Sequence, residues 1–214
     1  MPDAGVSVQF HTIHPVNPQL RLINQVVAII RQGGVIAYPT DSCYALGCHI
    51  GNKPAMERIS SIRKLDNSHD FTLVCRDLSE ISLYAKLGTR EFRLLKSLTP
   101  GPYTFILQAT REVPRRLQNP KRKTIGIRVP DHAITLSLLE ALGEPMMSVT
   151  LQMPGDDLPM TDARDIRDRI GSLLDAIIDG GPCGHEPTTV LDLTTDIPVV
   201  IRQGKGPVDF LVRE

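Results

Sequence analysis

The regular alternation of strand-like and helix-like segments is the strongest constraint on the fold of this 214-residue chain. Short runs rich in Val, Ile, Phe and Thr are followed by longer segments in which apolar residues recur every three or four positions. This alternation predicts an α/β protein: a single domain with a twisted mixed sheet and flanking helices. The strand-like segments are 7–14, 35–39, 71–75, 103–107, 124–129, 146–150, 175–179, 188–193 and 198–204. The helix-like segments are 17–34, 54–65, 77–87, 89–98, 133–143 and 162–174.

Several helix boundaries carry their own signals. Asn17 is the predicted N-cap of the first helix, and Gly33 its predicted end. Asn52 precedes the second helix. Asp77 and Glu80, three positions apart, form a start similar to a capping box for the third helix.

Composition excludes some classes of protein and leaves a folded, water-soluble one. No apolar stretch approaches the ~20 residues that a transmembrane helix needs. The N-terminus has no basic region followed by an apolar block, so we expect no secretory signal and a cytoplasmic location. The four cysteines, Cys43, Cys48, Cys75 and Cys183, match no familiar zinc spacing, and we expect reduced, buried thiols.

The net charge of zero hides an asymmetry. Residues 1–155 contain 18 basic and 12 acidic residues, whereas 156–214 contain 6 and 12. The segment 111–128 alone contains seven basic residues and one acidic residue. Such a cluster attracts the phosphates of a nucleotide or of a nucleic acid, although a solvated loop would have the same composition. The candidates for RNA binding are Arg115, Arg116, Lys121 and Lys123.

Polar side chains gather where the predicted strands end. Thr40, Asp41 and Ser42 follow the strand 35–39, where a capped turn is one interpretation and a ligand contact the other. Thr124 and Arg128 lie an even number of positions apart in one strand and therefore share a face. The same rule groups Ser148 with Thr150, and Thr188 and Arg202 lie near the ends of two later strands. Because ligands of α/β sheets bind at strand ends, these residues predict a polar cavity that contains arginines. Neither a dinucleotide fingerprint nor a phosphate loop is present.

The order of these motifs resembles that of a known family. The segments are GGVIAYPTDSCYALGC, TPGPYTFIL, TIGIRVPDH, MMSVTLQMPG, PTTVLDLT and VVIRQG. Together they resemble the YrdC-like superfamily of threonylcarbamoyl-AMP synthases over roughly residues 18–206, and most of all its YciO branch. One domain is expected over 1–214, with a core of about 15–206.

The resemblance implies a concave sheet with a positively charged cavity and a specific reaction. The synthases of this family join L-threonine, bicarbonate and ATP, with Mg²⁺, into threonylcarbamoyl-AMP and release pyrophosphate. Their product feeds the t6A modification of adenosine 37 in tRNA. Related domains are also described as binding double-stranded RNA. The chemistry depends on positioning and charge stabilisation, so no catalytic side chain is assigned.

Site residues follow from the resemblance position by position. The residues implied on the threonine side are Thr40, Arg128, Ser148 and Thr188. Those implied on the nucleotide side are Arg63, Lys64, Thr124, Thr150 and Arg202.

Two motifs depart from the family pattern. The K-x-R motif here is Arg63, Lys64 and Leu65, and the asparagine of the S-x-N motif is Gln152. Three functions therefore stay open: a threonylcarbamoyl-AMP synthase of reduced activity, a module that binds double-stranded RNA or tRNA, and a related enzyme that uses the same cavity on another substrate.

Overall fold

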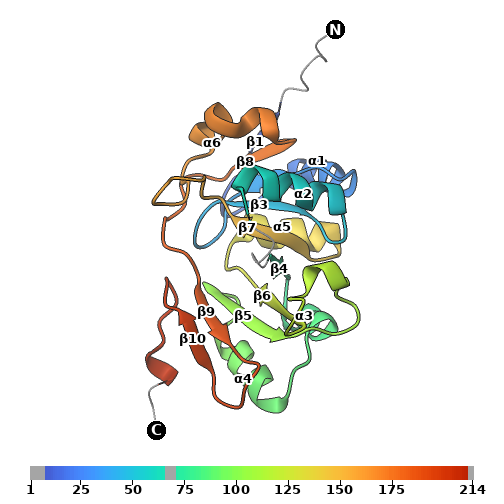
Figure 1. Cartoon of the computed structure of the whole chain (residues 1–214). Coiled ribbons are helices and arrows are strands. Elements are labelled where there is room, and N and C mark those ends of the chain that lie inside the picture. Colours follow the sequence, from blue (N-terminus) through green and yellow to red (C-terminus); the bar gives the residue numbers. More distant parts are fainter. Residues whose placement is uncertain (1–7, 66–70, 212–214) are drawn as a thin grey trace.

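The computed structural model describes residues 8–65 and 71–211, and its α/β architecture confirms the predicted class (Figure 1). The strands are β1 (Gln9–Thr12), β2 (Ile36–Tyr38), β3 (Ala45–His49), β4 (Thr72–Val74), β5 (Tyr103–Gln108), β6 (Thr124–Arg128), β7 (Met146–Thr150), β8 (Ala176–Asp179), β9 (Thr189–Asp192) and β10 (Val199–Arg202). The helices are α1 (Leu20–Arg31), α2 (Lys53–Arg63), α3 (Leu78–Tyr84), α4 (Thr89–Leu98), α5 (Ala133–Leu142) and α6 (Ala163–Ile170). Short 3₁₀ turns occupy Arg115–Leu117, Gly171–Leu173 and Asp209–Leu211.

The described strands form one mixed sheet in the order β1-β8-β2-β3-β7-β4-β6-β5-β9-β10. The pairs β1–β8, β8–β2, β4–β6 and β5–β9 are parallel, and the other neighbouring pairs are antiparallel. The strands β2, β3, β7 and β4 form an antiparallel block in the middle of the sheet.

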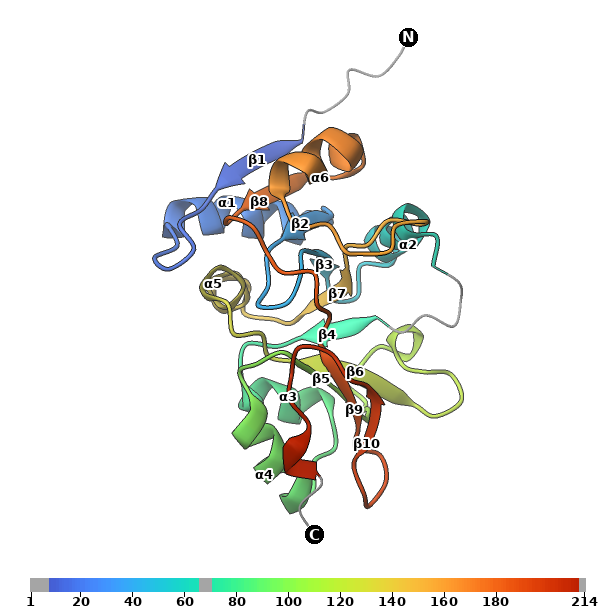
Figure 2. The same cartoon turned by 90° about the vertical axis from the view of Figure 1, so that its left-hand side faces the viewer.

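The sheet is strongly bent, as the connection from β8 to β9 requires. Residues 180–188 join two strands that lie far apart in the sheet order (Figures 1 and 2). In a flat sheet the two strands would be about 34 Å apart at ~4.8 Å per strand. A fully extended chain of this length reaches only about 33–36 Å, with no slack for local contacts. The segment nevertheless contacts the 40–43 turn, where Cys183 Sγ donates to the Thr40 carbonyl oxygen at 3.5 Å. The connection therefore crosses the concave side of the sheet.

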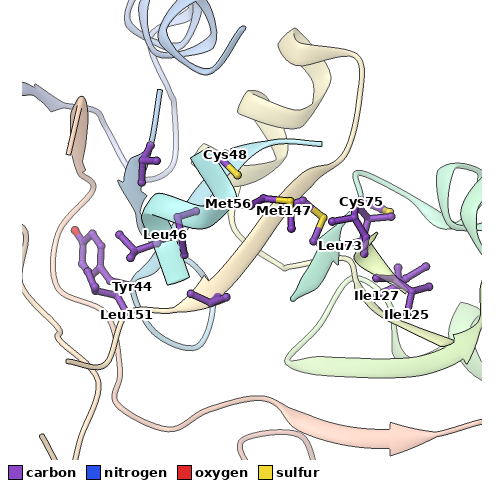
Figure 3. Close-up of a cluster of buried hydrophobic side chains, with 14 of the residues drawn as sticks. Tyr44, Leu46, Cys48, Met56, Leu73, Cys75, Ile125, Ile127, Met147 and Leu151 are labelled. Atoms are coloured by element: carbon purple, nitrogen blue, oxygen red, sulfur yellow. The ribbon is translucent and has the colours of Figure 1, made fainter. Parts of the chain in front are cut away.

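The convex face of the sheet is covered by α2, α3, α4 and α6. Alternate strand residues such as Leu46, Phe105 and Ile127 point to this face and pack with Met56 of α2 and Leu95 of α4. Figure 3 shows the middle of this core, where side chains from β3, β7, β4 and β6 meet α2. In Figure 2, α6 lies above the upper half of the bent sheet and α3 and α4 lie below the lower half.

The concave face is covered only in part. Helices α1 and α5 pack on β2 and β8 there, with Ile30, Leu138 and Ile36 among the buried residues. The uncovered part of this face belongs to β4, β5, β6, β9 and the end of β7. Because their alternate residues are mostly Thr, Ser, Gly and Arg, the uncovered part of the concave face is polar.

Most boundary predictions are confirmed, one is wrong, and one strand was not predicted. Asn52 accepts from the Ala55 amide at 2.9 Å, as a cap should. The prediction for Asn17 is wrong: α1 begins at Leu20, because Asn17 donates its amide to His14 Nδ1 in a preceding turn. Strand β3 was not predicted, since all but its last residue are buried and it shows no alternation of polar and apolar residues.

Within the described residues no helix is both long and apolar enough to cross a membrane. The four cysteines are free thiols; three are buried and Cys183 is partly buried.

Candidate functional site

A cavity of about 330 Å³ occupies the uncovered part of the concave face. Its floor comes from alternate residues of the central strands, which all point to one side of the sheet. Gly126 lies at the middle of this floor, so no side chain rises between its neighbours Thr72 and Thr104. The floor and wall residues from strands β4 to β7 and β9 are Thr72, Thr104, Ile106, Thr124, Gly126, Arg128, Ser148, Val149, Thr150 and Val190.

Three arginines line the cavity, and its described lining contains no carboxylate. They come from separate elements: Arg63 is the last residue of α2, Arg128 ends β6 and Arg202 ends β10. Burial lowers the pKa of Arg63 and of Arg202, because desolvation disfavours the charged form. The pKa of an arginine starts so high that both side chains stay charged. The cavity is therefore suited to an anionic ligand.

Two of these arginines have unsatisfied donors. The Nε atoms of Arg63 and Arg128 are buried and have no hydrogen-bond partner among the described residues. A buried, unpartnered donor is costly, and more so when it is charged. A ligand that accepts these bonds would remove that cost.

The Arg128 guanidinium is held at the turn that follows β2. Its Nη2 donates to Asp41 Oδ1, and its Nη1 donates to Ser42 Oγ at 3.3 Å. Both charged side chains of the ion pair are about nine-tenths buried. The Arg128 charge is thus partly compensated within the protein.

Hydroxyl groups supply the other polar contacts of the lining. Tyr38 Oη lies 2.6 Å from Ser148 Oγ, beneath the cavity, and burial raises the pKa of Tyr38 to about 12. Tyr38 therefore remains protonated near neutral pH. Thr104 Oγ1 lies 2.9 Å from Thr188 Oγ1, and the Arg202 guanidinium donates to the Thr188 carbonyl oxygen at 2.9 Å. These contacts fix the orientation of Ser148, Thr188 and Arg202.

Thr40 forms the capped turn and also lies at the cavity, the two alternatives considered for residues 40–42. Its hydroxyl donates to the Cys43 carbonyl oxygen at 2.7 Å and accepts from the amides of Ser42 and Cys43 at 3.2 Å. The capped turn predicted for 40–42 is therefore present. Thr40 also lines the cavity, but its hydroxyl is already used by the turn.

Most of the predicted site residues meet in this one cavity. Those that line it are Thr40, Arg63, Thr124, Arg128, Ser148, Thr150, Thr188 and Arg202. Lys64 does not: it ends α2 in a left-handed conformation, with φ of 49°, and is exposed. Leu65, at the altered motif position, packs against the hydrophobic core. Gln152 lines the cavity and donates to the Asp156 carbonyl oxygen at 2.8 Å.

Sequence reasoning missed several lining residues, including Thr72, Thr104 and Gly126. A signal for two of them was available, because Thr104 and Gly126 alternate with apolar residues in strands that were predicted. The role of Asp41 as the partner of Arg128 has no such signal, since the two residues are distant in the sequence.

The four candidates for RNA binding lie outside the cavity lining. Arg115 and Arg116 are in a 3₁₀ turn, and Lys121 and Lys123 precede β6. All four are exposed. Arg116 Nη2 donates to the Gly51 carbonyl oxygen, which connects this loop to the start of α2.

Comparisons with known proteins decide the family. A family model named for Sua5, YciO and YrdC, and described as telomere recombination, matches residues 28–204. The chain belongs to the Sua5/YciO/YrdC family. The cavity described above is thus a feature of a family member, as the motif order predicted.

The relatives fall into two groups. The chain is 60% identical over 200 residues to the uncharacterised protein YciO of Escherichia coli K12, covering 94% of this chain and 97% of that protein. It is 31% identical over 176 residues to a threonylcarbamoyl-AMP synthase of Coxiella burnetii RSA 493, covering 81% and 93% of the two chains. High similarity therefore points to YciO, and more distant similarity to the synthases.

Solved structures show the same division. The crystal structure of E. coli YciO matches with a TM-score of 0.91 at 59% identity, over 94% of this chain and 98% of that one. P. abyssi Sua5 in complex with L-threonine matches with a TM-score of 0.83 at 27% identity, over 91% of this chain and 57% of that one. The Sua5 chain thus extends well beyond the part that is matched.

Proposed function

We propose that the chain binds L-threonine and ATP in its cavity and catalyses nucleotidyl transfer of the threonylcarbamoyl-AMP synthase type. One observation carries the proposal: residues assigned to a threonine side and to a nucleotide side, from distant segments, line the same arginine-bearing cavity. The L-threonine complex of P. abyssi Sua5 and the synthase relatives support it. The product would serve t6A modification of tRNA.

On the threonine side, Arg128 would bind the amino-acid carboxylate. A guanidinium offers a planar pair of donors that matches a carboxylate, and the Nε of Arg128 is without a partner. Ser148 and Thr188 would contact the remaining polar atoms of the amino acid, while Thr40 would shape this end through its turn. A carbamate of threonine and bicarbonate would keep the same anchor.

On the nucleotide side, Arg63 and Arg202 would bind phosphate, with the hydroxyls of Thr124 and Thr150 beside them. A carbamate oxygen would form a bond to the α-phosphorus, and the bond to the β-phosphate oxygen would break as pyrophosphate leaves. Negative charge grows on the phosphate oxygens in this step. The arginines that line the cavity would stabilise that charge, so no acid or base side chain is needed.

The chain's residues suit a magnesium ion that is bound mainly by ATP. No cluster of three or more His, Cys, Asp or Glu side chains suited to a metal occurs in the described parts of the chain. Mg²⁺ usually keeps several waters and binds substrate phosphates, which a hydroxyl-rich lining accommodates. When bound, the ion would withdraw charge from the phosphate oxygens.

The test is threonine-dependent release of pyrophosphate. Purified protein is incubated with ATP, Mg²⁺ and bicarbonate, with and without L-threonine, beside an active synthase of the family. Release that needs threonine and is lost in Arg128→Met supports the proposal. No release above the threonine-free control, together with no calorimetric signal for threonine or ATP, refutes it.

A second function, binding of double-stranded RNA or tRNA, has one observation in its favour. Arg115, Lys121 and Lys123 are exposed and form no ion pair with a carboxylate of the described residues. Phosphate binding by such side chains weakens steeply with salt. We expect the quadruple alanine variant at 115, 116, 121 and 123 to lose RNA binding; unchanged binding would exclude this surface.

A further inference from the structure

Asp41 has contacts that its turn does not require. A turn aspartate ordinarily bonds to the backbone amides just after it. Here the Thr40 hydroxyl accepts from those amides. The Asp41 carboxylate instead reaches two distant segments: Oδ1 accepts from Arg128 Nη2, and Oδ2 accepts from the Asp131 amide at 3.1 Å. Its backbone carbonyl accepts from Lys205 Nζ.

These contacts fix how the Arg128 guanidinium is presented. Asp41 and Ser42 occupy one Nη each, so one turn holds both terminal nitrogens. The Nε is left unpartnered. A planar guanidinium anchored at both Nη groups cannot rotate freely, and its Nε–H direction is then set by the anchor.

The Asp41 carboxylate itself does not line the cavity. It is about nine-tenths buried and both of its oxygens accept hydrogen bonds from the protein. Asp41 therefore offers no free acceptor to a ligand, and its ion pair with Arg128 is its hydrogen-bonded link to the cationic part of the cavity lining.

We propose that Asp41 is a positioning residue that locks the Arg128 guanidinium in the orientation that binds a ligand carboxylate. The effect on threonine rests on the proposed function. The orientation of Arg128 does not, and it is measurable without ligand.

The ligand-free test observes the arginine side chains by ¹⁵N NMR, with Arg128 assigned by its loss in Arg128→Lys. We expect resolved Nη signals for Arg128 in the unmodified protein, because rotation is slow when both Nη groups are bonded. Asp41→Asn should merge them. Asp192→Asn is the matched control, because its buried carboxylate accepts from Arg122 Nη2 at 2.6 Å outside the cavity lining. It should leave the Arg128 signals unchanged.

Calorimetry measures how the Asp41 substitution changes the affinity for L-threonine. We expect Asp41→Asn to raise the Kd about tenfold or more, from the loss of a charged hydrogen bond that orients Arg128. Asp192→Asn should change it less than about twofold.

The outcomes separate the two proposals. Merged Arg128 signals in the unmodified protein overturn the positioning role, and this result does not depend on the stability of any variant. Resolved Arg128 signals in Asp41→Asn overturn it as well. Equal threonine affinity in the unmodified protein and Asp41→Asn also overturns it. If the unmodified protein does not bind threonine, the proposed function is refuted. Arg128 signals that are resolved in the unmodified protein and merge in Asp41→Asn would still support the positioning role of Asp41.

Discussion

Gly126 allows the cavity to be filled without disturbing the fold. A Cβ at this position would lie 3.5 Å from Thr104 Cγ2 and 3.6 Å from Thr72 Oγ1, which are ordinary contacts. The rest of a larger side chain must then extend into the cavity. The three leucine carbon atoms beyond Cβ would occupy part of the space of about 330 Å³ above this floor.

We expect Gly126→Leu to fold and to lose its ligands. Glycine within a strand costs about 0.5–1 kcal/mol relative to alanine, and 1 kcal/mol corresponds to about 2–4 °C for a chain of this size. The Tm of the leucine variant should therefore stay the same or rise by about 2 °C. The Kd values for L-threonine and ATP should rise about 100-fold, because the side chain occupies the floor shared by both proposed ligands.

Calorimetry and thermal unfolding are the assays, and Gly126→Ala is the matched control. Its single carbon reaches only the two ordinary contacts, so its Kd values should stay within a few-fold of those of the unmodified protein. A folded leucine variant that binds threonine and ATP normally would show that the cavity is not the binding site.

Three further predictions follow from particular contacts. Arg63→Met should raise the Kd for ATP about tenfold or more, whereas Lys64→Met should change it less than about twofold, and equal effects would contradict the placement of the two side chains. Gln152→Ala removes the donor to the Asp156 carbonyl oxygen, so hydrogen exchange of the Asp156 amide, which donates to the Met153 carbonyl oxygen at 3.0 Å, should quicken about fivefold. Unchanged exchange would mean that this bond does not order the loop. Burial lowers the pKa of His11 below its usual 6.5, so the unfolded state binds more protons and stability falls as the pH drops below 6.5. Urea unfolding from about pH 7 to about pH 5 should show a weaker decline in His11→Phe, and an identical decline would exclude His11 as a source.

The candidate site was partly predictable because side-chain alternation is a local property. The sequence places Thr124 and Arg128 on one face of a strand, and the structure has both in the cavity lining. Alternation does not identify β3, which is buried on both faces. The helical pattern of α2 does not show that Lys64 ends the helix in a left-handed conformation and lies outside the cavity lining.

The α/β class, most of the helices and strands, and the family could be predicted from the order of residues along the chain. Those properties depend on periodicity and motif order along the chain. Which strands are neighbours is seen only in the folded chain, and this strand order produces the bend that brings Arg63, Arg128 and Arg202 to one cavity. The pairing of Asp41 with Arg128 is likewise seen only in the folded chain. Strand order and long-range ion pairs depend on how the whole chain packs, and no local pattern of residues encodes them.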